Sequence, residues 1–213
     1  MLLNAQEEVM FAQFVAEQSL EDFQAEQFKR YLSLIRSWNE YMNITTIVDV
    51  DEILNYHFQD SLVIRTMLDF NTFTGFADIG TGGGFPGIPL KICYPNHFVV
   101  LLEVNQKKIK FLEAVIKELA LTNIVVEPLD WRTFLRKTTY PLDVMFSRAA
   151  LHTDELIRMF RPKCFYRNAR LMYWASRHWL PGQQEKLFIE KEVPYNVGQK
   201  QRKLVFFINK QMQ

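Results

Sequence analysis

A cluster of glycines in the stretch Gly75–Gly87, written GFADIGTGGGFPG, has the composition and spacing of a turn that binds a ligand. A short run of strand character leads directly into Gly80, Gly82 and Gly84. Glycine takes the positive φ angles of such a turn and lets backbone N–H groups approach a ligand. A helix is expected over Ile88–Tyr94, and its N-terminus adds free donors and a partial positive charge. The stretch therefore predicts a nucleotide-type ligand at the end of the first strand of an α/β sheet.

Two motifs overlap in this turn, and they imply different ligands. Gly82, Gly84 and Gly87 match G-x-G-x-x-G, the fingerprint of dinucleotide binding. Asp78, Gly80, Gly82 and Gly84 match D-x-G-x-G-x-G, which resembles motif I of the S-adenosylmethionine (SAM) methyltransferases. The second motif is favoured because the strand ends just before Gly80, so the turn starts there. We expect these four residues to contact SAM, and the alternative is a glycine-rich turn without a ligand.

Carboxylates follow the next two predicted strands. Glu103 ends the strand Phe98–Glu103, 21 residues after Gly82, where a carboxylate can accept both ribose hydroxyls of an adenosine. The alternative for Glu103 is a surface residue beside Lys107.

Asp130 and Trp131 follow the third predicted strand, Ile124–Pro128. There a carboxylate could accept from an adenine amino group, and an indole could lie on the ring face. The alternatives are a helix N-cap at Asp130 and a core anchor at Trp131.

Elements that position these residues can be read from the hydrophobic pattern. From Gly75 onward strands alternate with helices, which predicts a mostly parallel sheet. The remaining strands are expected at Phe76–Ile79, Leu142–Phe146, Arg170–Trp174, 186–194 and Leu204–Ile208, and the helices at Lys107–Leu119, Trp131–Leu135 and Asp154–Phe160.

The chain before the sheet is expected to be helical. Residues 1–42 are predicted to form two helices, the second with Ser19 as its N-cap. Asp51–Leu68 is predicted as a further helix, in which His57 is more often a structural histidine than a catalyst. We therefore expect a helical extension over residues 1–70 and a ligand-binding domain over residues 71–213.

Charge is distributed unevenly along the chain. Residues 1–106 carry 5 Lys or Arg against 14 Asp or Glu, whereas residues 107–213 carry 20 against 10. This asymmetry suggests an anionic partner for the second half, and nucleic acid is the first candidate for that partner. The alternative is a solvated surface that is unevenly charged.

Cys93 and Cys164 lie 71 residues apart, which predicts neither a disulfide framework nor a metal site. No apolar run reaches the ~18 residues of a membrane span, so we expect a cytoplasmic protein with no membrane partner.

Five blocks occur in one order and spacing that resembles the RsmG (GidB) family of bacterial small-subunit rRNA guanine-N7 methyltransferases. They are WNEYMNIT at 38–45, HFQDSL at 57–62, FADIGTGGGFPGIPL at 76–90, LLEVNQKKIKFL at 101–112 and FSRA at 146–149. The resemblance implies a Rossmann-like class I SAM-dependent methyltransferase fold, with a mostly parallel seven-stranded sheet, an antiparallel last strand and an N-terminal helical extension. It also implies that the substrate is small-subunit (16S) rRNA or its ribosomal particle, and we expect the protein to be a monomer.

By the same resemblance, residues of this chain take roles at the cofactor and at the RNA. Gly80, Gly82, Phe85, Glu103, Trp131 and Arg132 would line the SAM site, and Arg148 would lie between the cofactor and the target base as the catalytic residue. Arg202 would lie near the RNA site, and the other expected RNA-binding residues, Arg177, Lys200 and Lys203, belong to the basic face suggested by the charge of the second half. For Arg148 the alternative is a structural ion pair with Asp143 or Glu103.

The chain departs from the family pattern at two places, so other functions stay open. Asp130 stands where relatives usually carry an arginine, and Tyr173–Ser176 replaces a Leu-Lys-Gly segment. The alternatives are a methyltransferase of another RNA or of a small molecule, a non-catalytic SAM-binding factor that binds RNA, and a nicotinamide dehydrogenase. Guanine N7 is an exposed lone pair, so the expected reaction needs positioning and no general base.

Overall fold

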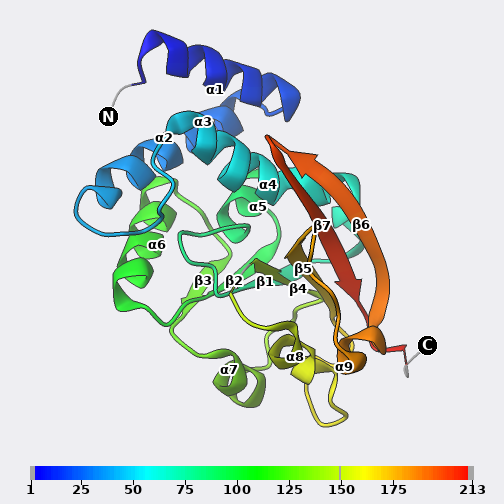
Figure 1. Cartoon of the computed structure of the whole chain (residues 1–213). Helices are drawn as coiled ribbons and strands as arrows, with labels where there is room; N and C mark the ends of the chain where they lie inside the picture. The colour runs from blue at the N-terminus through cyan, green and yellow to red at the C-terminus, as the bar shows by residue number, and fades with distance from the viewer. Residues whose placement is uncertain (1–2, 149, 211–213) are drawn as a thin grey trace.

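A seven-stranded sheet with the strand order β3-β2-β1-β4-β5-β7-β6 forms the centre of the computed structural model, which describes residues 3–148 and 150–210 (Figure 1). Strands β1 to β5 pair in parallel, and β7 runs antiparallel to both of its neighbours. The mostly parallel sheet with an antiparallel last strand is therefore confirmed. The strands are β1 (Gly75–Ile79), β2 (Phe98–Leu102), β3 (Ile124–Glu127), β4 (Val144–Arg148), β5 (Arg170–Ser176), β6 (Ile189–Val197) and β7 (Lys200–Phe207).

Helices cover both faces of this sheet (Figure 1). The crossover helices are α5 (Gly87–Cys93), α6 (Gln106–Glu118), α7 (Trp131–Lys137), α8 (Thr153–Leu156) with its 3-10 continuation η4 (Ile157–Phe160), and α9 (Gln183–Lys186). The strand order reverses between β1 and β4, because β2 and β3 extend the sheet to one side and β4 and β5 to the other. Ligands of open α/β sheets bind beside such a reversal, at the carboxyl ends of the strands.

Alternation along the strands divides the core into two parts. Phe76 and Phe146 point to the face covered by the N-terminal helices and α6. Ala77 and Met145 point to the opposite face, where the core is completed by α7 and the α8–η4 segment. Successive side chains of a strand point to opposite faces, so the same short strands serve both cores.

The N-terminal helices α1 (Ala5–Glu17) and α2 (Asp22–Asn39) share the first of these cores, and α1 contributes Phe11 and Phe14. The predicted N-cap at Ser19 is wrong. Ser19 lies in the connection with a φ of 50°, and Glu21 caps α2 through a capping box with Gln24.

The segment predicted as one helix over 51–68 is a series of different helical turns. It comprises α3 (Val50–Ile53), the π-helix η1 (Leu54–Gln59), α4 (Asp60–Leu62) and the 3-10 helix η2 (Val63–Thr66), with a separate turn η3 (Phe70–Thr72) before β1. π-helical turns are rare and frequently occur at functional sites. Here the π turn lies just before Asp60, a fully buried carboxylate.

Strand boundaries differ from the sequence prediction where charged residues continue a strand. β4 extends to Arg148, which was expected to follow it, and β7 begins at Lys200 and so includes Arg202. β6 begins after the predicted start of its strand, because residues 183–186 form α9.

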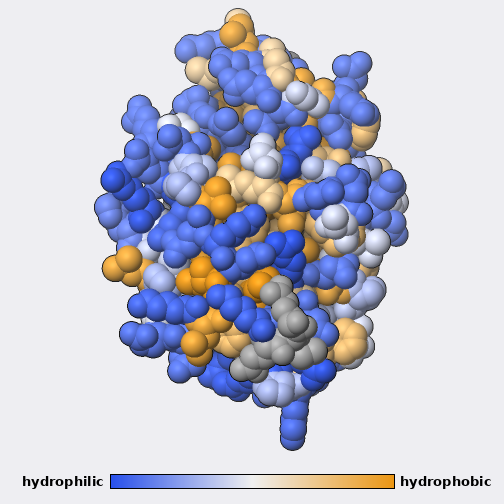
Figure 2. All heavy atoms as spheres, turned by 90° about the vertical axis from the view of Figure 1, so that its right-hand side faces the viewer, coloured by the Kyte–Doolittle hydropathy of each residue, from blue (hydrophilic) through white to orange (hydrophobic). Residues whose placement is uncertain are grey.

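Figure 2 shows the face that includes the β6–β7 hairpin, where hydrophilic residues surround hydrophobic patches. In the described part of the chain no helix combines the length and apolar character needed to cross a bilayer.

Candidate active site

The glycine turn joins β1 to α5 at the reversal of strand order. Gly80, Gly82 and Gly84 have φ angles of 66°, 61° and 99°, so the positive φ predicted for this turn is present. A Cβ added to Gly82 would meet nothing closer than the Lys108 Nζ at 3.8 Å, so the space above this residue is open. A Cβ on Gly80 would lie 2.3 Å from the Cβ of Ala150, which shows that the turn after β1 touches the segment after β4.

Asp78 holds the turn together from beneath. Its Oδ2 atom accepts hydrogen bonds from the Thr81 hydroxyl at 2.6 Å and from the Gly87 backbone N–H at 2.7 Å. Burial raises the pKa of Asp78 to about 6, although both of these bonds lower it. The carboxylate therefore links the end of β1 to the start of α5, and its predicted contact with SAM stays a prediction.

Glu103 connects the glycine turn to the loop after β2. One carboxylate oxygen accepts from the Gly82 N–H at 3.0 Å, and the other accepts from the N–H groups of Val104 and Asn105, each at 2.9 Å. The alternative of a surface residue beside Lys107 is wrong, because Glu103 is only 8% exposed. A carboxylate offers about four lone-pair sites, so Glu103 keeps acceptor capacity for a ligand at this edge of the sheet.

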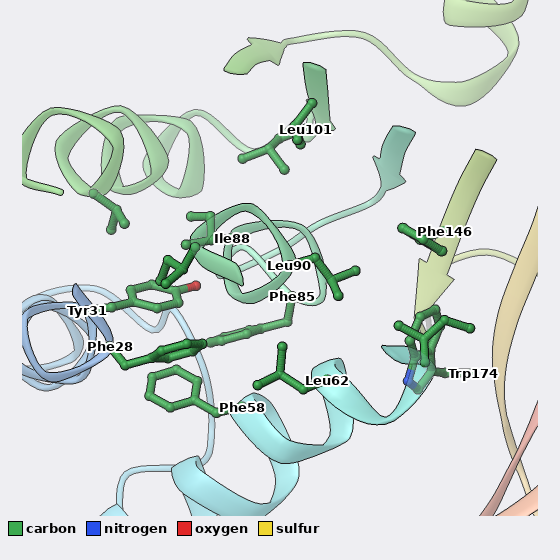
Figure 3. Close-up of a cluster of buried hydrophobic side chains, with 14 of the residues drawn as sticks. Phe28, Tyr31, Phe58, Leu62, Phe85, Ile88, Leu90, Leu101, Phe146 and Trp174 are labelled. Atoms are coloured by element: carbon green, nitrogen blue, oxygen red, sulfur yellow. The ribbon is translucent and has the colours of Figure 1, made fainter. Parts of the chain in front are cut away.

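Phe85 lies inside an aromatic stack rather than at an open surface (Figure 3). Its ring stacks on His57 with centroids 4.3 Å apart, and the ring of Tyr31 lies 5.5 Å away on α2. The Tyr31 hydroxyl donates to the Gly83 carbonyl, so α2 also supports the glycine turn. The guanidinium of Arg148 lies 5.2 Å from the centre of the Phe85 ring. Phe85 therefore supports Arg148 from one side.

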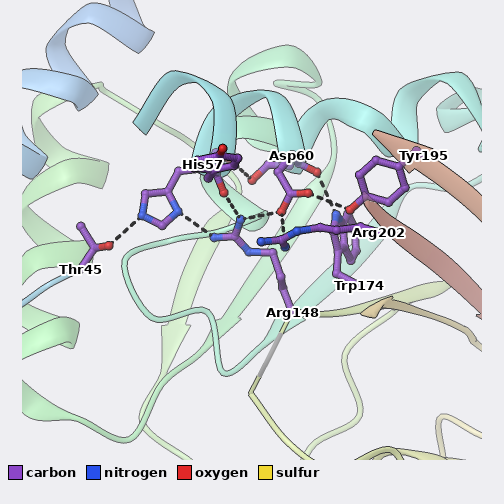
Figure 4. A network of polar contacts seen from close by, with 9 residues as sticks. Thr45, His57, Asp60, Arg148, Trp174, Tyr195 and Arg202 are labelled. Atoms are coloured by element: carbon purple, nitrogen blue, oxygen red, sulfur yellow. Dashed lines mark hydrogen bonds and ion pairs between the residues drawn. The ribbon is translucent and has the colours of Figure 1, made fainter. Parts of the chain in front are cut away.

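Arg148 and Arg202 share one buried carboxylate, that of Asp60 (Figure 4). Both arginines reach Asp60 Oδ2 at 3.0 Å, and the Tyr195 hydroxyl donates to Oδ1 at 2.7 Å. The Trp174 indole N–H donates to the Asp60 backbone carbonyl at 2.8 Å. The ion pair of Arg148 was expected with Asp143 or Glu103. Both expectations are wrong, because Arg148 pairs with Asp60. The network joins the helical segment before the sheet to β4, β5, β6 and β7.

His57 completes the network as a neutral acceptor. Burial and the positive charges of Arg148 and Arg202 lower the pKa of His57 to about 3. Its Nδ1 lies 3.2 Å from the Arg148 Nη2 and its Nε2 lies 2.8 Å from the Thr45 hydroxyl. With Nδ1 accepting from the guanidinium, Nε2–H donates to Thr45. Arg148 also donates to the Tyr56 carbonyl at 2.8 Å, so its planar head is held on three sides.

The residues after β3 are occupied by contacts within the protein. Asp130 caps α7 by accepting from the Thr133 N–H at 3.0 Å, as its alternative interpretation expected. Trp131 is a buried core residue whose indole N–H donates to the Glu155 carbonyl at 2.9 Å. Arg132 donates to both carboxylate oxygens of Glu155 at 2.8 and 2.7 Å. Their contacts with SAM stay predictions.

The four predicted RNA-binding residues lie on or beside the β6–β7 hairpin. Arg202 is brought next to Arg148 by Asp60. Lys200 lies 3.7 Å from the centre of the Tyr56 ring, and Lys203 pairs with Glu192 at 2.7 Å. Arg177 is exposed after β5 and donates to the Gln201 side chain. Their role in RNA binding is not tested by these contacts.

Sequence reasoning missed Asp60 and Tyr195 as parts of this site. Asp60 was seen only as one letter of a block shared with a family, and no role was assigned to it. A signal was present, because an acidic residue within the apolar face of a helical segment needs a partner. The identity of that partner could not be read from the sequence, since Arg148 lies 88 residues away and Arg202 lies 142 residues away.

Comparison with known proteins identifies the family of this chain. The family model for GidB, described as rRNA small subunit methyltransferase G, matches residues 24–205. The chain belongs to this family. GidB relatives include the ribosomal RNA small subunit methyltransferase G of Lachnoclostridium phytofermentans, 39% identical over 145 residues that cover 67% of this chain and 60% of that protein. The corresponding protein of Bacillus pumilus is 43% identical over 103 residues, 48% of this chain and 43% of that protein. The chain thus matches at most about 60% of the length of these relatives.

Solved structures support the fold of this GidB chain. A human methyltransferase 10 domain containing protein has a TM-score of 0.57 at 14% identity, covering 85% of this chain and 97% of that one. A MtNAS mutant in complex with S-adenosylmethionine also has a TM-score of 0.57, at 15% identity, covering 96% and 80%. M. capricolum TrmK in complex with S-adenosylhomocysteine has a TM-score of 0.51 at 15% identity, covering 68% of this chain and 70% of that one. At these identities the likeness concerns the fold, and the predicted Rossmann-like methyltransferase fold is confirmed.

Proposed function

We propose that this protein is a SAM-dependent methyltransferase that transfers a methyl group to N7 of a guanine in small-subunit (16S) rRNA. The observation that carries the proposal is the GidB family match over residues 24–205. The rRNA is free or in its ribosomal particle, and the protein acts as a monomer in the cytoplasm. Residues 1–70 form the helical extension and residues 71–213 the methyltransferase domain.

The residues at the reversal of strand order fit SAM. Among the described residues, Asp78 Oδ1 and Ser147 Oγ are buried without a hydrogen-bond partner. Ile79 of β1 pairs with Ser147 of β4, so both orphaned atoms lie near the carboxyl ends of the two strands that flank the reversal. Buried polar atoms normally have partners. The two side chains point to opposite faces of the sheet, so a polar ligand at the carboxyl ends of the strands would supply a partner to the side chain on its own face. Gly80, Gly82, Gly84 and Phe85 would form the turn side of the site, and Glu103 would accept from the ribose.

The reaction requires that the protein position the two reactants, and it does not require a general base. Bound SAM supplies a methyl group attached to a positively charged sulfur. When the methyl group is transferred, the sulfur keeps the electrons of the broken bond and becomes neutral. Guanine N7 attacks with an exposed lone pair, so no side chain has to remove a proton. Arg148, held by Asp60, His57 and the Tyr56 carbonyl, would donate to guanine O6 or to a phosphate and leave the N7 lone pair free. Arg202, Arg177, Lys200 and Lys203 would contact the RNA beside it.

A transfer assay with a matched pair of variants tests this function. Methyl-labelled SAM is incubated with unmethylated small-subunit particles or free 16S rRNA, and the modified nucleoside is identified. We expect label at guanine N7. Glu103→Ala should bind SAM at least about 10-fold more weakly, because a charge-assisted hydrogen bond contributes roughly 1.5–3 kcal/mol. The control is Glu113→Ala, an exposed glutamate on α6, which should bind SAM normally.

The proposal would be contradicted by absence of transfer to guanine at every salt and magnesium concentration. Transfer to a small metabolite, with no affinity for RNA, would instead support a small-molecule methyltransferase. SAM and RNA binding without turnover would support a non-catalytic factor. Binding of NADH in place of SAM would show that the glycine turn belongs to a dinucleotide site.

A further inference from the structure

A basic groove lies on the flank of the molecule between α7, η4 and the segment 161–164 that follows η4. Its volume is about 510 Å³ and its floor includes Leu135 and Cys164. Five cationic side chains line it and define what is called the basic groove below: Arg132, Arg136, Arg158, Arg161 and Lys163. These elements cover the face of the sheet opposite to the N-terminal helices, so the groove is separate from the Arg148–Asp60–Arg202 network.

Glu155 organises two of these cations. Its carboxylate binds Arg132 at 2.7 Å and Arg158 at 2.9 Å, so one negative charge holds two guanidinium groups in the groove. The side chains of Arg132 and Arg158 remain 59% and 31% exposed. Asp130 and Asp154 also attract Arg132 from further away. The five cations of the groove still outnumber these three carboxylates, so the groove as a whole keeps an excess of positive charge.

The other three cations form no close ion pair in the described part of the chain, although Arg136 is attracted by Asp130 at longer range. Within residues 3–148 and 150–210, Arg136, Arg161 and Lys163 make no ion pair, and all three are exposed. Like charges gathered on one surface repel each other unless an anion joins them. The exposure of the groove suits a screened, salt-dependent contact with a polyanion better than a closed pocket for a small anion.

The position of the groove relates it to the proposed site. Arg132 is the second residue of α7, five residues after the end of β3, and Glu103 follows the adjacent β2. The carboxyl ends of these parallel strands lie at one edge of the sheet. The basic groove thus begins at the edge where the cofactor residues gather and continues down the flank along α7.

We propose that the basic groove binds the phosphate backbone of the RNA substrate. It would be a second contact surface in addition to the β6–β7 hairpin. The inference rests on the proposed function, because it assigns the same RNA a further binding site. Contacts of this kind position an RNA strand without reading its bases. They would hold the strand on one flank while the target base enters at the reversal of strand order.

The test is the double variant Arg161→Ala/Lys163→Ala, compared with Lys110→Ala/Lys117→Ala on α6. Both pairs are exposed and lack an ion pair within the described part of the chain, so each double variant removes two positive charges. Affinity for protein-free small-subunit rRNA and for the assembled particle is measured between 50 and 200 mM salt. We expect the groove variant to bind the free rRNA roughly 10-fold more weakly at 100 mM salt. The slope of log affinity against log salt should fall by about 1.4, at about 0.7 per lost phosphate contact. SAM binding should be unchanged.

Each other outcome decides against part of the proposal. Equal affinities and slopes for the groove and α6 variants would overturn the inference, even if the wild type methylates guanine. Weaker binding of the groove variant to the particle alone, with normal binding to free rRNA, would assign the groove to a protein surface and overturn the RNA assignment. If the wild type binds RNA through the groove and transfers no methyl group, the proposed function fails while the inference stands.

Discussion

Asp60 is a fully buried carboxylate shared by two arginines from distant parts of the chain. At the scale of single residues it is the side chain on which most polar contacts of the candidate site converge. Its two oxygens accept from Arg148, Arg202 and Tyr195, and its backbone carbonyl accepts from Trp174. A buried ion pair contributes little net stability, but removal of one partner leaves an uncompensated charge.

We therefore predict that Asp60→Asn lowers the free energy of unfolding by about 3–5 kcal/mol, because two guanidinium groups would lose their counter-charge. The control is Asp154→Asn, an exposed carboxylate at the start of α8, which should change stability by less than about 0.5 kcal/mol. Urea unfolding followed by circular dichroism measures both. Equal stabilities of Asp60→Asn and the wild type would show that the network is dispensable for the fold.

Among single residues, the sequence identified those at the turn better than those in the network. Gly80, Gly82 and Gly84 were predicted from their spacing, and their positive φ angles confirm the turn. Glu103 was predicted at the end of β2, and the structure adds that it accepts from the Gly82 N–H. Turn chemistry and strand ends are local properties, so they could be read from adjacent residues.

The glycine turn is the element in which backbone conformation and ligand binding are linked. Gly82 has a positive φ and open space above it. Gly198, in the turn between β6 and β7, has a φ of 51°, and a Cβ added to it would lie 3.0 Å from the ring of Tyr56, which would have to shift slightly. Both positions would therefore strain a residue that has a Cβ, and only one of them belongs to the proposed cofactor site.

We predict that Gly82→Ala and Gly198→Ala each destabilise the protein by roughly 1–2 kcal/mol, because a Cβ disfavours the left-handed conformation. Gly82→Ala should in addition weaken SAM binding by at least about 10-fold, since the added methyl group occupies the open space. Gly198→Ala should bind SAM as the wild type does. Thermal unfolding and calorimetric titration separate the two effects, and equal SAM affinities of both variants would place the cofactor elsewhere.

Helical segments were harder to predict than the turn. The pattern over 51–68 indicated one helix, whereas the structure has α3, the π-helix η1, α4 and η2 in succession. The apolar spacing of this segment does not distinguish a π turn from an α turn, because the two differ by one residue per turn. The tertiary contacts of this segment account for the change from a single helix to a series of turns. His57 stacks on Phe85, and Asp60 has to reach Arg148.

At the scale of the whole molecule, the N-terminal helices are part of the core and of the site. Tyr31 of α2 supports the glycine turn, and Phe58 packs against Tyr31 with ring centroids 5.4 Å apart. The boundary expected at residue 70 therefore divides the chain by sequence pattern and cuts through one continuous hydrophobic core.

We predict that a fragment of residues 71–213 does not unfold cooperatively, because it exposes the sheet face that the N-terminal helices cover and leaves Arg148 and Arg202 without Asp60. Near-ultraviolet circular dichroism and urea titration should show no sharp transition, in contrast to the full chain. Adding residues 1–70 as a separate fragment should restore part of the transition. A cooperative transition of the fragment alone would show that the two parts are independent.

The sequence by itself determined the glycine turn, the alternation of strands and helices, the excess of positive charge in the second half and the likeness to the GidB family. These properties depend on neighbouring residues or on composition. Only the tertiary structure decided that Asp60 joins Arg148 to Arg202, and that α7, η4 and the segment after η4 bring five cations to one groove. Hydrophobic periodicity shows which face of an element is buried, but not which distant element covers it. Contacts between segments 88 and 142 residues apart therefore emerge only when the chain has packed.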